Sequence, residues 1–151
     1  MSKRLKHFIL QLPGVNSYCD CEKLCSQIEV EHVMPRKILM QRLSIKEFKM
    51  ADIDPHNLYK CCHMLNAEKG SLVLGDKYLG YDFGGMLARS CVYMDSRYSL
   101  NFEPELIKIW NNLSIFYPPF HFEYSRSKII AEYTGKVNPF IDDYNKLYNR
   151  Y

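Results

Sequence analysis

The sequence predicts a single α+β domain that is rich in helices. Its 151 residues are enough for one domain with a core, and 47% of them are apolar, which excludes a disordered chain. One short β-prone run is followed by several segments whose apolar residues recur at helical spacing. No internal repeat, low-complexity tract or Gly/Ser-rich linker divides residues 1–151.

The first fifty residues predict one short strand between two less regular stretches. A short helix is expected over residues 18–26. Residues 28–33 are β-prone and predict a strand, which Pro35 then ends. The basic stretch over residues 37–48 predicts a helix or a long loop.

The middle of the chain predicts a loop, a helix and a second loop. Residues 52–57 have loop chemistry, with Asp-Pro marking a turn. Residues 58–69 predict a helix, with Asn57 as a candidate N-cap and Gly70 as its end. Residues 75–85 are rich in glycine and tyrosine and predict a loop.

The second half predicts three helices, over residues 86–97, 104–116 and 122–133. The first has apolar residues at i, i+4, i+7 and i+11, and the second begins with a proline at its first turn. A glycine at position 135 ends the third. Residues 138–142 predict a turn followed by an apolar anchor.

The charge permits, but does not require, a polyanionic partner. The formal net charge is +3 and the pI is about 8.5. The basic residues concentrate between positions 36 and 49, where five of them occur with a single acid, Glu47. Taken alone, such a run most often covers a solvated helix face, and the alternative is a surface that follows nucleic-acid phosphates. The five are Arg36, Lys37, Arg42, Lys46 and Lys49.

The chain has no visible signal peptide and no apolar run long enough to cross a membrane, which predicts an intracellular protein without a membrane partner. In a reducing compartment its six cysteines are expected to be free, partly buried thiols. The alternative is a structural zinc site, although the spacing is irregular for zinc. Its ligands would be Cys21, Cys25, Cys61 or Cys62, and His63.

A carboxylate, a histidine and a carboxamide suggest phosphodiester chemistry. Glu31 and His32 are adjacent at the end of the predicted strand, and Asn66 follows on the predicted helix. Mg²⁺ prefers a few hard oxygen ligands and keeps several waters, which Glu31 and Asn66 would satisfy. His32 would take the proton from water as a general base. Asn57 could orient His32 by accepting a hydrogen bond from the other ring nitrogen.

Five motifs occur in the order found in a known nuclease family. They are residues 30–35 (VEHVMP), residues 54–58 (DPHNL), Asn66 with Lys69-Gly70, residues 84–98 (GGMLARSCVYMDSRY), and residues 138–142 (NPFID). In these residues the chain resembles the endonuclease I family of bacterial-type deoxyribonucleases. That family belongs to the ββα-metal, or His-Me finger (HNH-like), nucleases. The resemblance extends over most of the chain.

The resemblance implies a ββα-metal finger core within the single mixed domain. It implies His32 as the general base, Glu31 and Asn66 as ligands of Mg²⁺ or Mn²⁺, and Asn57 or His56 as supporting residues. Arg126 stands where the family has an arginine and is a candidate phosphate contact. The expected nucleic-acid contacts are Arg36, Lys37, Arg42 and Lys69, with Arg36 and Arg42 as local candidates for the family's phosphate-clamping arginine.

The implied activity is cleavage of DNA, with RNA as a second substrate and little sequence preference. An enzyme of this kind would suit a virus, a phage, a mobile element, or a toxin held by an inhibitor protein. Three alternatives stay open: a site-selective HNH-type homing endonuclease, a non-catalytic nucleic-acid-binding domain on the same scaffold, and a structural zinc module.

Overall fold

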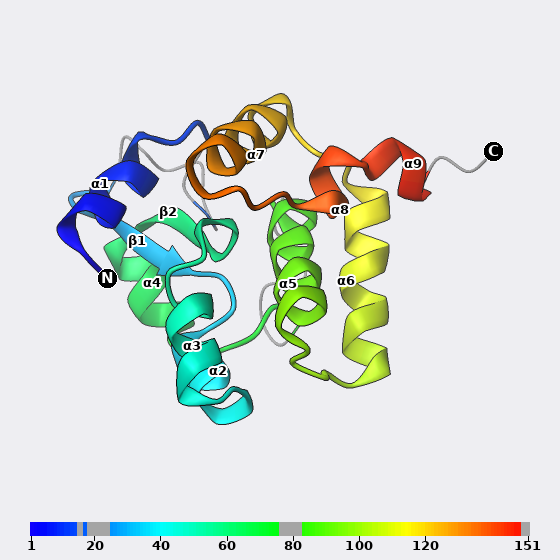
Figure 1. Ribbon diagram of the computed structural model, residues 1–151, viewed down its shortest axis with the longest axis horizontal. Helices are drawn as coiled ribbons and strands as arrows, with labels where there is room; N and C mark the ends of the chain where they lie inside the picture. The colour runs from blue at the N-terminus through cyan, green and yellow to red at the C-terminus, as the bar shows by residue number, and fades with distance from the viewer. Residues whose placement is uncertain (15–16, 18–24, 76–82, 149–151) are drawn as a thin grey trace.

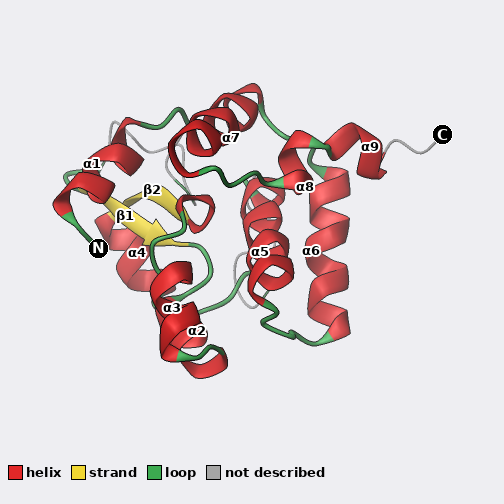
Figure 2. Ribbon diagram, viewed as in Figure 1, coloured by secondary structure: helices red, strands yellow, loops and turns green. Residues whose placement is uncertain are grey.

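The computed structural model describes residues 1–14, 17, 25–75 and 83–148 (Figure 1). In this part of the chain a two-stranded antiparallel sheet is combined with helices, so the predicted α+β class is confirmed (Figure 2).

The sheet and the shorter helices form one side of the domain. Strands β1 and β2 are antiparallel, and α4 follows β2 without a linker. Two short helices and a 3-10 turn connect the strands. The elements are α1 (Lys3–Gln11), β1 (Ile28–His32), α2 (Arg36–Arg42), α3 (Ile45–Ala51), η1 (Pro55–Asn57), β2 (Leu58–Cys62) and α4 (His63–Lys69).

Longer helices, together with the short α8 and α9, form the other side, where α5 and α6 run alongside each other and α7 crosses near one end (Figure 1). Helix α5 is buried along most of its length because the sheet side and α6 pack against it. It therefore forms the centre of the core. The elements are α5 (Gly84–Tyr98), α6 (Pro104–Phe116), α7 (His121–Thr134), α8 (Pro139–Asp142) and α9 (Tyr144–Tyr148).

The prediction of one helix over residues 58–69 is wrong in its first half. Residues 58–62 form β2, and the helix begins only at His63. In this short run, Leu58, Cys61 and Leu65 satisfy a helical spacing, but the backbone of residues 58–62 pairs with β1 in register. Sequence periodicity alone cannot separate a buried strand from a helix over five residues. Asn57 is consequently not the N-cap of this helix.

The basic stretch forms two helices instead of one. Helix α2 ends at Arg42, and Ser44 begins α3 with a capping box in which its side chain accepts from Glu47 N and Glu47 returns the contact. The predictions for β1 and for α5, α6 and α7 are confirmed to within two residues. Most of the helix expected over residues 18–26, and most of the loop over 75–85, lie outside the described residues.

The cysteines are only partly as predicted. Cys61 and Cys91 are free and buried, and burial raises their thiol pKa values to about 11 and about 12. Cys25 and Cys62 instead form a disulfide, so the expectation of free thiols is wrong for this pair. Zinc binding through the predicted set would need Cys25 as a thiolate, which the disulfide prevents. Cys19 and Cys21 lie outside the described residues.

Reducing the Cys25–Cys62 disulfide is expected to lower the free energy of unfolding by about 3–4 kcal/mol, because the bond closes a loop between residues 37 positions apart. Urea unfolding with and without dithiothreitol measures this. The Cys25→Ser variant should respond less to reductant than the wild type does, and an unchanged midpoint in the wild type would contradict the bond. Disulfides persist mainly in oxidising compartments, so this bond does not fit the reducing compartment expected from the sequence.

No helix within the described ranges is both long and apolar enough to cross a membrane.

Candidate active site

The two strands and α4 form a ββα unit that carries the predicted catalytic residues. Glu31 pairs with Tyr59 and His32 with Leu58, so both lie at the end of β1 that meets the start of β2. Asn66 lies in the middle of α4, which packs against both strands. The arrangement of the two-strand-plus-helix finger is therefore present.

A pocket of about 240 Å³ lies along β1 and contains five of the predicted site residues. These are Glu31, His32, Arg36, Lys37 and Asn66, and the remaining lining residues are Val30, Pro35, Gly70 and Ser71. Three consecutive strand residues line it, although neighbouring strand side chains point to opposite faces. The pocket therefore follows the edge of β1, where side chains from both faces of the strand border the same space. For this reason the adjacent residues Glu31 and His32 can line one site.

The loop after α3 fixes the ring of His32. Nε2 lies 2.9 Å from the main-chain oxygen of Asp52 and 3.2 Å from Asp52 Oδ1. A carbonyl oxygen can only accept, so the proton of a neutral ring belongs on Nε2. Nδ1 is left with its lone pair, and it is the atom able to accept a proton.

The environment of His32 favours the neutral ring. Burial lowers the pKa of His32 below its ordinary value of 6.5, and the positive charges of Arg36 and Lys69 act in the same direction. The contacts with Asp52 raise the pKa but do not outweigh burial. A general base that acts near pH 7 must be neutral before it reacts, so this shift suits the proposed role.

Asp52 connects His32 to Arg36. Its carboxylate accepts from Arg36 Nε at 2.5 Å and from Arg36 Nη2 at 3.1 Å, while half of the arginine side chain stays exposed. Such a paired contact holds the planar guanidinium in one orientation. Arg36 is thus fixed at the pocket with its remaining surface open to a phosphate.

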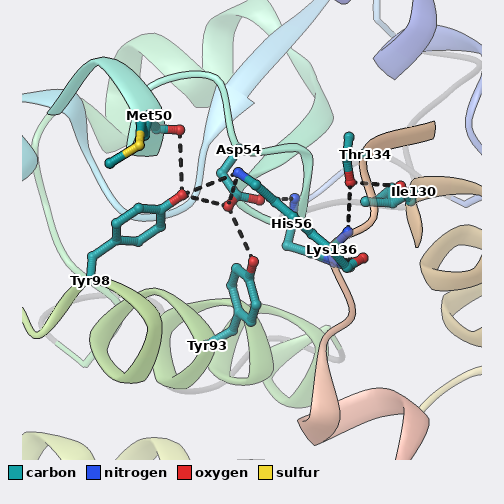
Figure 3. A network of polar contacts seen from close by, with 8 residues as sticks. All are labelled: Met50, Asp54, His56, Tyr93, Tyr98, Ile130, Thr134 and Lys136. Atoms are coloured by element: carbon teal, nitrogen blue, oxygen red, sulfur yellow. Dashed lines mark hydrogen bonds and ion pairs between the residues drawn. The ribbon is translucent and has the colours of Figure 1, made fainter. Parts of the chain in front are cut away.

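The same loop is anchored from the opposite direction by a buried carboxylate, Asp54. It accepts from the amide of His56 and the hydroxyls of Tyr93 and Tyr98, and it pairs with Lys136 at 2.8 Å (Figure 3). Several donors on one buried carboxylate make a rigid anchor. The carbonyl of Asp52, two residues earlier, is held in position as a result.

Glu31 forms a buried ion pair directly beneath the pocket. Its Oε1 lies 2.5 Å from Lys69 Nζ, which also donates to the main-chain oxygen of His32 at 3.0 Å. Both side chains are almost fully buried. The predicted role of Lys69 in binding nucleic acid is therefore not supported, since its charge is used inside the site.

Asn66 contacts a second carboxylate, that of Glu29. Its Nδ2 donates to Glu29 Oε1, and His63 Nδ1 lies 3.1 Å from Glu29 Oε2. Burial raises the pKa of Glu29, but the hydrogen bonds from Asn66 and His63 outweigh it, so the pKa lies below its ordinary value. With its nitrogen turned to Glu29, Asn66 has its carboxamide oxygen on the other side.

The donors in this pocket fit magnesium better than zinc. The described residues contain no group of three or more His, Cys, Asp or Glu side chains that could hold a metal. Mg²⁺ needs no such group, because it keeps several waters and uses one or two protein oxygens. Glu31 and Asn66 supply a carboxylate and a carboxamide at one pocket, and Mg²⁺ accepts oxygen ligands of both kinds.

The predicted hydrogen bond from His32 to Asn57 is wrong. Asn57 Oδ1 accepts from Met34 N at 2.6 Å, and its Nδ2 donates to Met34 O at 3.0 Å. This buried side chain thus fixes the turn that follows His32 instead of contacting the ring. His56 also lies away from the pocket, buried against Tyr93 with its Nε2 3.2 Å from Lys136 O.

Two arginines that were expected to bind phosphate donate to main-chain carbonyls away from the pocket instead. Arg126 is buried and donates to the carbonyls of Pro55 and Leu58, at 2.7 and 2.5 Å, with its guanidinium over the ring of Tyr59. It braces the turn that leads into β2. Arg42 donates to the carbonyls of residues 100 and 101. The structure does not bring Arg42 or Arg126 to the pocket.

Two residues of the site were missed by the sequence analysis. Asp52 contacts His32 partly through its main-chain oxygen, and every residue type has such an oxygen, so the residue type does not indicate this contact. Glu29 could have been found, because it lies two residues before Glu31 on the same strand, and alternate strand residues share a face.

The comparisons with known proteins do not identify the chain. No protein-family model matches it, and no curated protein sequence does.

Proposed function

We propose that this protein is a metal-dependent endonuclease that hydrolyses phosphodiester bonds in DNA, with RNA as a second substrate and low sequence specificity. The observation that carries the proposal is the state of His32. Its Nε2 is held by Asp52, its Nδ1 is left as the base, and Glu31, Asn66 and Arg36 line the same pocket. The resemblance of the ordered motifs to the endonuclease I family supports the same reaction.

Different residues of the pocket would carry out the separate tasks of the reaction. His32 Nδ1 takes a proton from water as the water oxygen bonds to phosphorus, and the bond from phosphorus to the leaving sugar oxygen breaks. The leaving oxygen then takes a proton from solvent. The imidazolium that forms is stabilised by the Asp52 carboxylate, 3.2 Å from Nε2. Arg36 and Lys37 line the pocket and bind the phosphate oxygens.

Glu31 and Asn66 would hold Mg²⁺ or Mn²⁺, and such an ion supplies charge neutralisation on the phosphate and on the leaving oxygen. The basic side chains of Lys46 and Lys49, exposed on α3, extend the positive surface beyond Arg36. This surface suits a backbone-following, sequence-independent contact.

Plasmid digestion with Mg²⁺ tests the proposal and separates it from its alternatives. A smear of products is expected, because phosphate contacts carry no sequence information. Discrete bands would instead favour a site-selective homing-type enzyme. Salt-sensitive DNA binding without any cleavage would contradict the proposal and favour a non-catalytic binding domain.

The cleavage rate is expected to fall on the acid side with a midpoint below pH 6.5. Because the pKa of His32 is lowered from 6.5, the ring is mostly neutral at pH 7 and becomes mostly protonated only below pH 6.5. Single-turnover rates at constant ionic strength measure the profile. A rate that falls as the pH drops through 7 would show that the base has a raised pKa, and cleavage unchanged at pH 4.5 would remove His32 from the role.

A further inference from the structure

A second and larger cavity borders the loop that holds His32 but shares no lining residue with the first. Its volume is about 650 Å³, within the range of small-molecule sites. Five separate segments build it, and Figure 3 shows side chains from three of them around Asp54. The lining residues come from α1 and its N-cap, from α3, from the loop at residues 53 and 55, from the end of α5, and from residues 133–136.

The wall of this cavity is mainly apolar and is left uncovered. Met50, Ile53 and Tyr133 line it and are 45%, 49% and 47% exposed. Leu5 and Pro55 extend the same wall. Large apolar side chains gathered in a concave site would gain free energy if an apolar group covered them.

The charged groups at the cavity favour an anion. Lys136 Nζ uses two of its three donors, on Asp54 Oδ2 at 2.8 Å and on the Tyr98 hydroxyl at 3.3 Å. Arg97 is exposed, and no ion pair with it is found among the described carboxylates. The one acid in the lining, Glu47, is turned to Ser44, whose amide and hydroxyl donate to its Oε2 at 3.0 and 2.5 Å.

We propose that this cavity binds a small organic anion, in which an apolar body covers the wall formed by Met50, Ile53 and Tyr133 and one carboxylate or phosphate contacts Arg97 and Lys136. The proposal is independent of the nuclease activity. If the proposed function holds, the occupant would also contact the loop on which His32 depends, since Ile53 is next to Asp52.

Calorimetric titration of the full chain tests this site with two probes, octanoate and deoxyadenosine 5′-monophosphate, one for each source of the anion. Octan-1-ol serves as the uncharged counterpart of octanoate. At least one anion is expected to bind with a millimolar or lower Kd, and octanoate should bind more tightly than octan-1-ol. Binding of octanoate identifies a carboxylate ligand, and binding of the nucleotide identifies a phosphate ligand.

Matched variants assign the binding to this cavity. Arg97→Gln should weaken the bound anion about tenfold, since it removes a charged hydrogen-bond partner. Lys108→Gln, an exposed change on α6 outside the lining, should have no effect. Ile53→Ser should weaken binding, and Ile45→Ser, at an exposed position outside the lining, should not.

Three results would overturn the proposal. One is no binding of either anion at about 10 mM, well above the expected millimolar Kd. Another is equal binding by Arg97→Gln and Lys108→Gln. The third is nucleotide binding that Arg36→Gln abolishes and Arg97→Gln leaves intact, which would place the nucleotide at the His32 pocket.

Discussion

Replacing His32 by alanine is expected to lower the rate of DNA cleavage by about a hundredfold or more, because the variant lacks the base that takes the proton from water. The fold should survive, since the ring lies at the end of β1 and, within the described part of the chain, its polar contacts are with Asp52. The loss of those contacts is expected to cost about 1 kcal/mol of stability. Single-turnover cleavage of a short duplex, with urea unfolding of the same preparation, measures both quantities.

A matched histidine gives the control for this loss. His7 is exposed on α1, and His7→Ala should cleave at the wild-type rate. If His32→Ala and His7→Ala cleave equally fast, the assignment of the base is wrong. If His32→Ala is inactive but also unfolded, the conservative variant His32→Gln separates a lost base from a lost structure.

Replacing Lys69 by methionine is expected to lower the free energy of unfolding by about 3 kcal/mol or more, because it breaks the buried ion pair between Lys69 and Glu31. The change keeps a similar side-chain length, so packing is largely retained. The control is Lys37→Met, which removes an exposed lysine from the same pocket and should change stability by less than about 0.5 kcal/mol. Urea unfolding of the two variants measures the difference.

The Lys69→Met variant also tests Glu31 as a metal ligand without any cleavage assay. If Glu31 binds Mg²⁺, the ion replaces the missing charge, so Mg²⁺ should raise the Tm of Lys69→Met more than that of the wild type. The double variant Glu31→Gln, Lys69→Met should regain stability and lose this response. Equal Mg²⁺ responses of the single variant and the wild type would contradict the assignment of Glu31.

The sequence predicts the fold best where one pattern dominates. Helices α5, α6 and α7 follow from apolar residues at helical spacing, with Pro104 and Gly135 marking a start and an end. The sequence pattern of β2 also fits a helix, because its identity as a strand depends on pairing with β1, which is distant in the sequence. The start of a separate helix α3 could have been predicted from the sequence, since Ser44 and Glu47 have the spacing of a capping box.

In the candidate site, too, the sequence predicts local placement better than contacts with distant segments. Glu31, His32 and Asn66 meet at one pocket as expected, because the strand end and α4 bring them together. The roles expected of Asn57 and Arg126 differ from their contacts, because both bind main-chain groups of distant segments. Residue type and spacing indicate which chemistry is available, but not which carbonyl a side chain will contact.

The most direct test of the central claim is nicking of supercoiled plasmid by the purified protein, measured with Mg²⁺ and with EDTA beside an identically prepared His32→Ala sample. The wild type is expected to nick the plasmid in Mg²⁺ and not in EDTA, and His32→Ala is expected to nick it at least about a hundredfold less. Absence of nicking by the wild type in Mg²⁺ and in Mn²⁺ would contradict the claim. Nicking that is equal in both samples would contradict it as well, because the cleavage would not come from the His32 site.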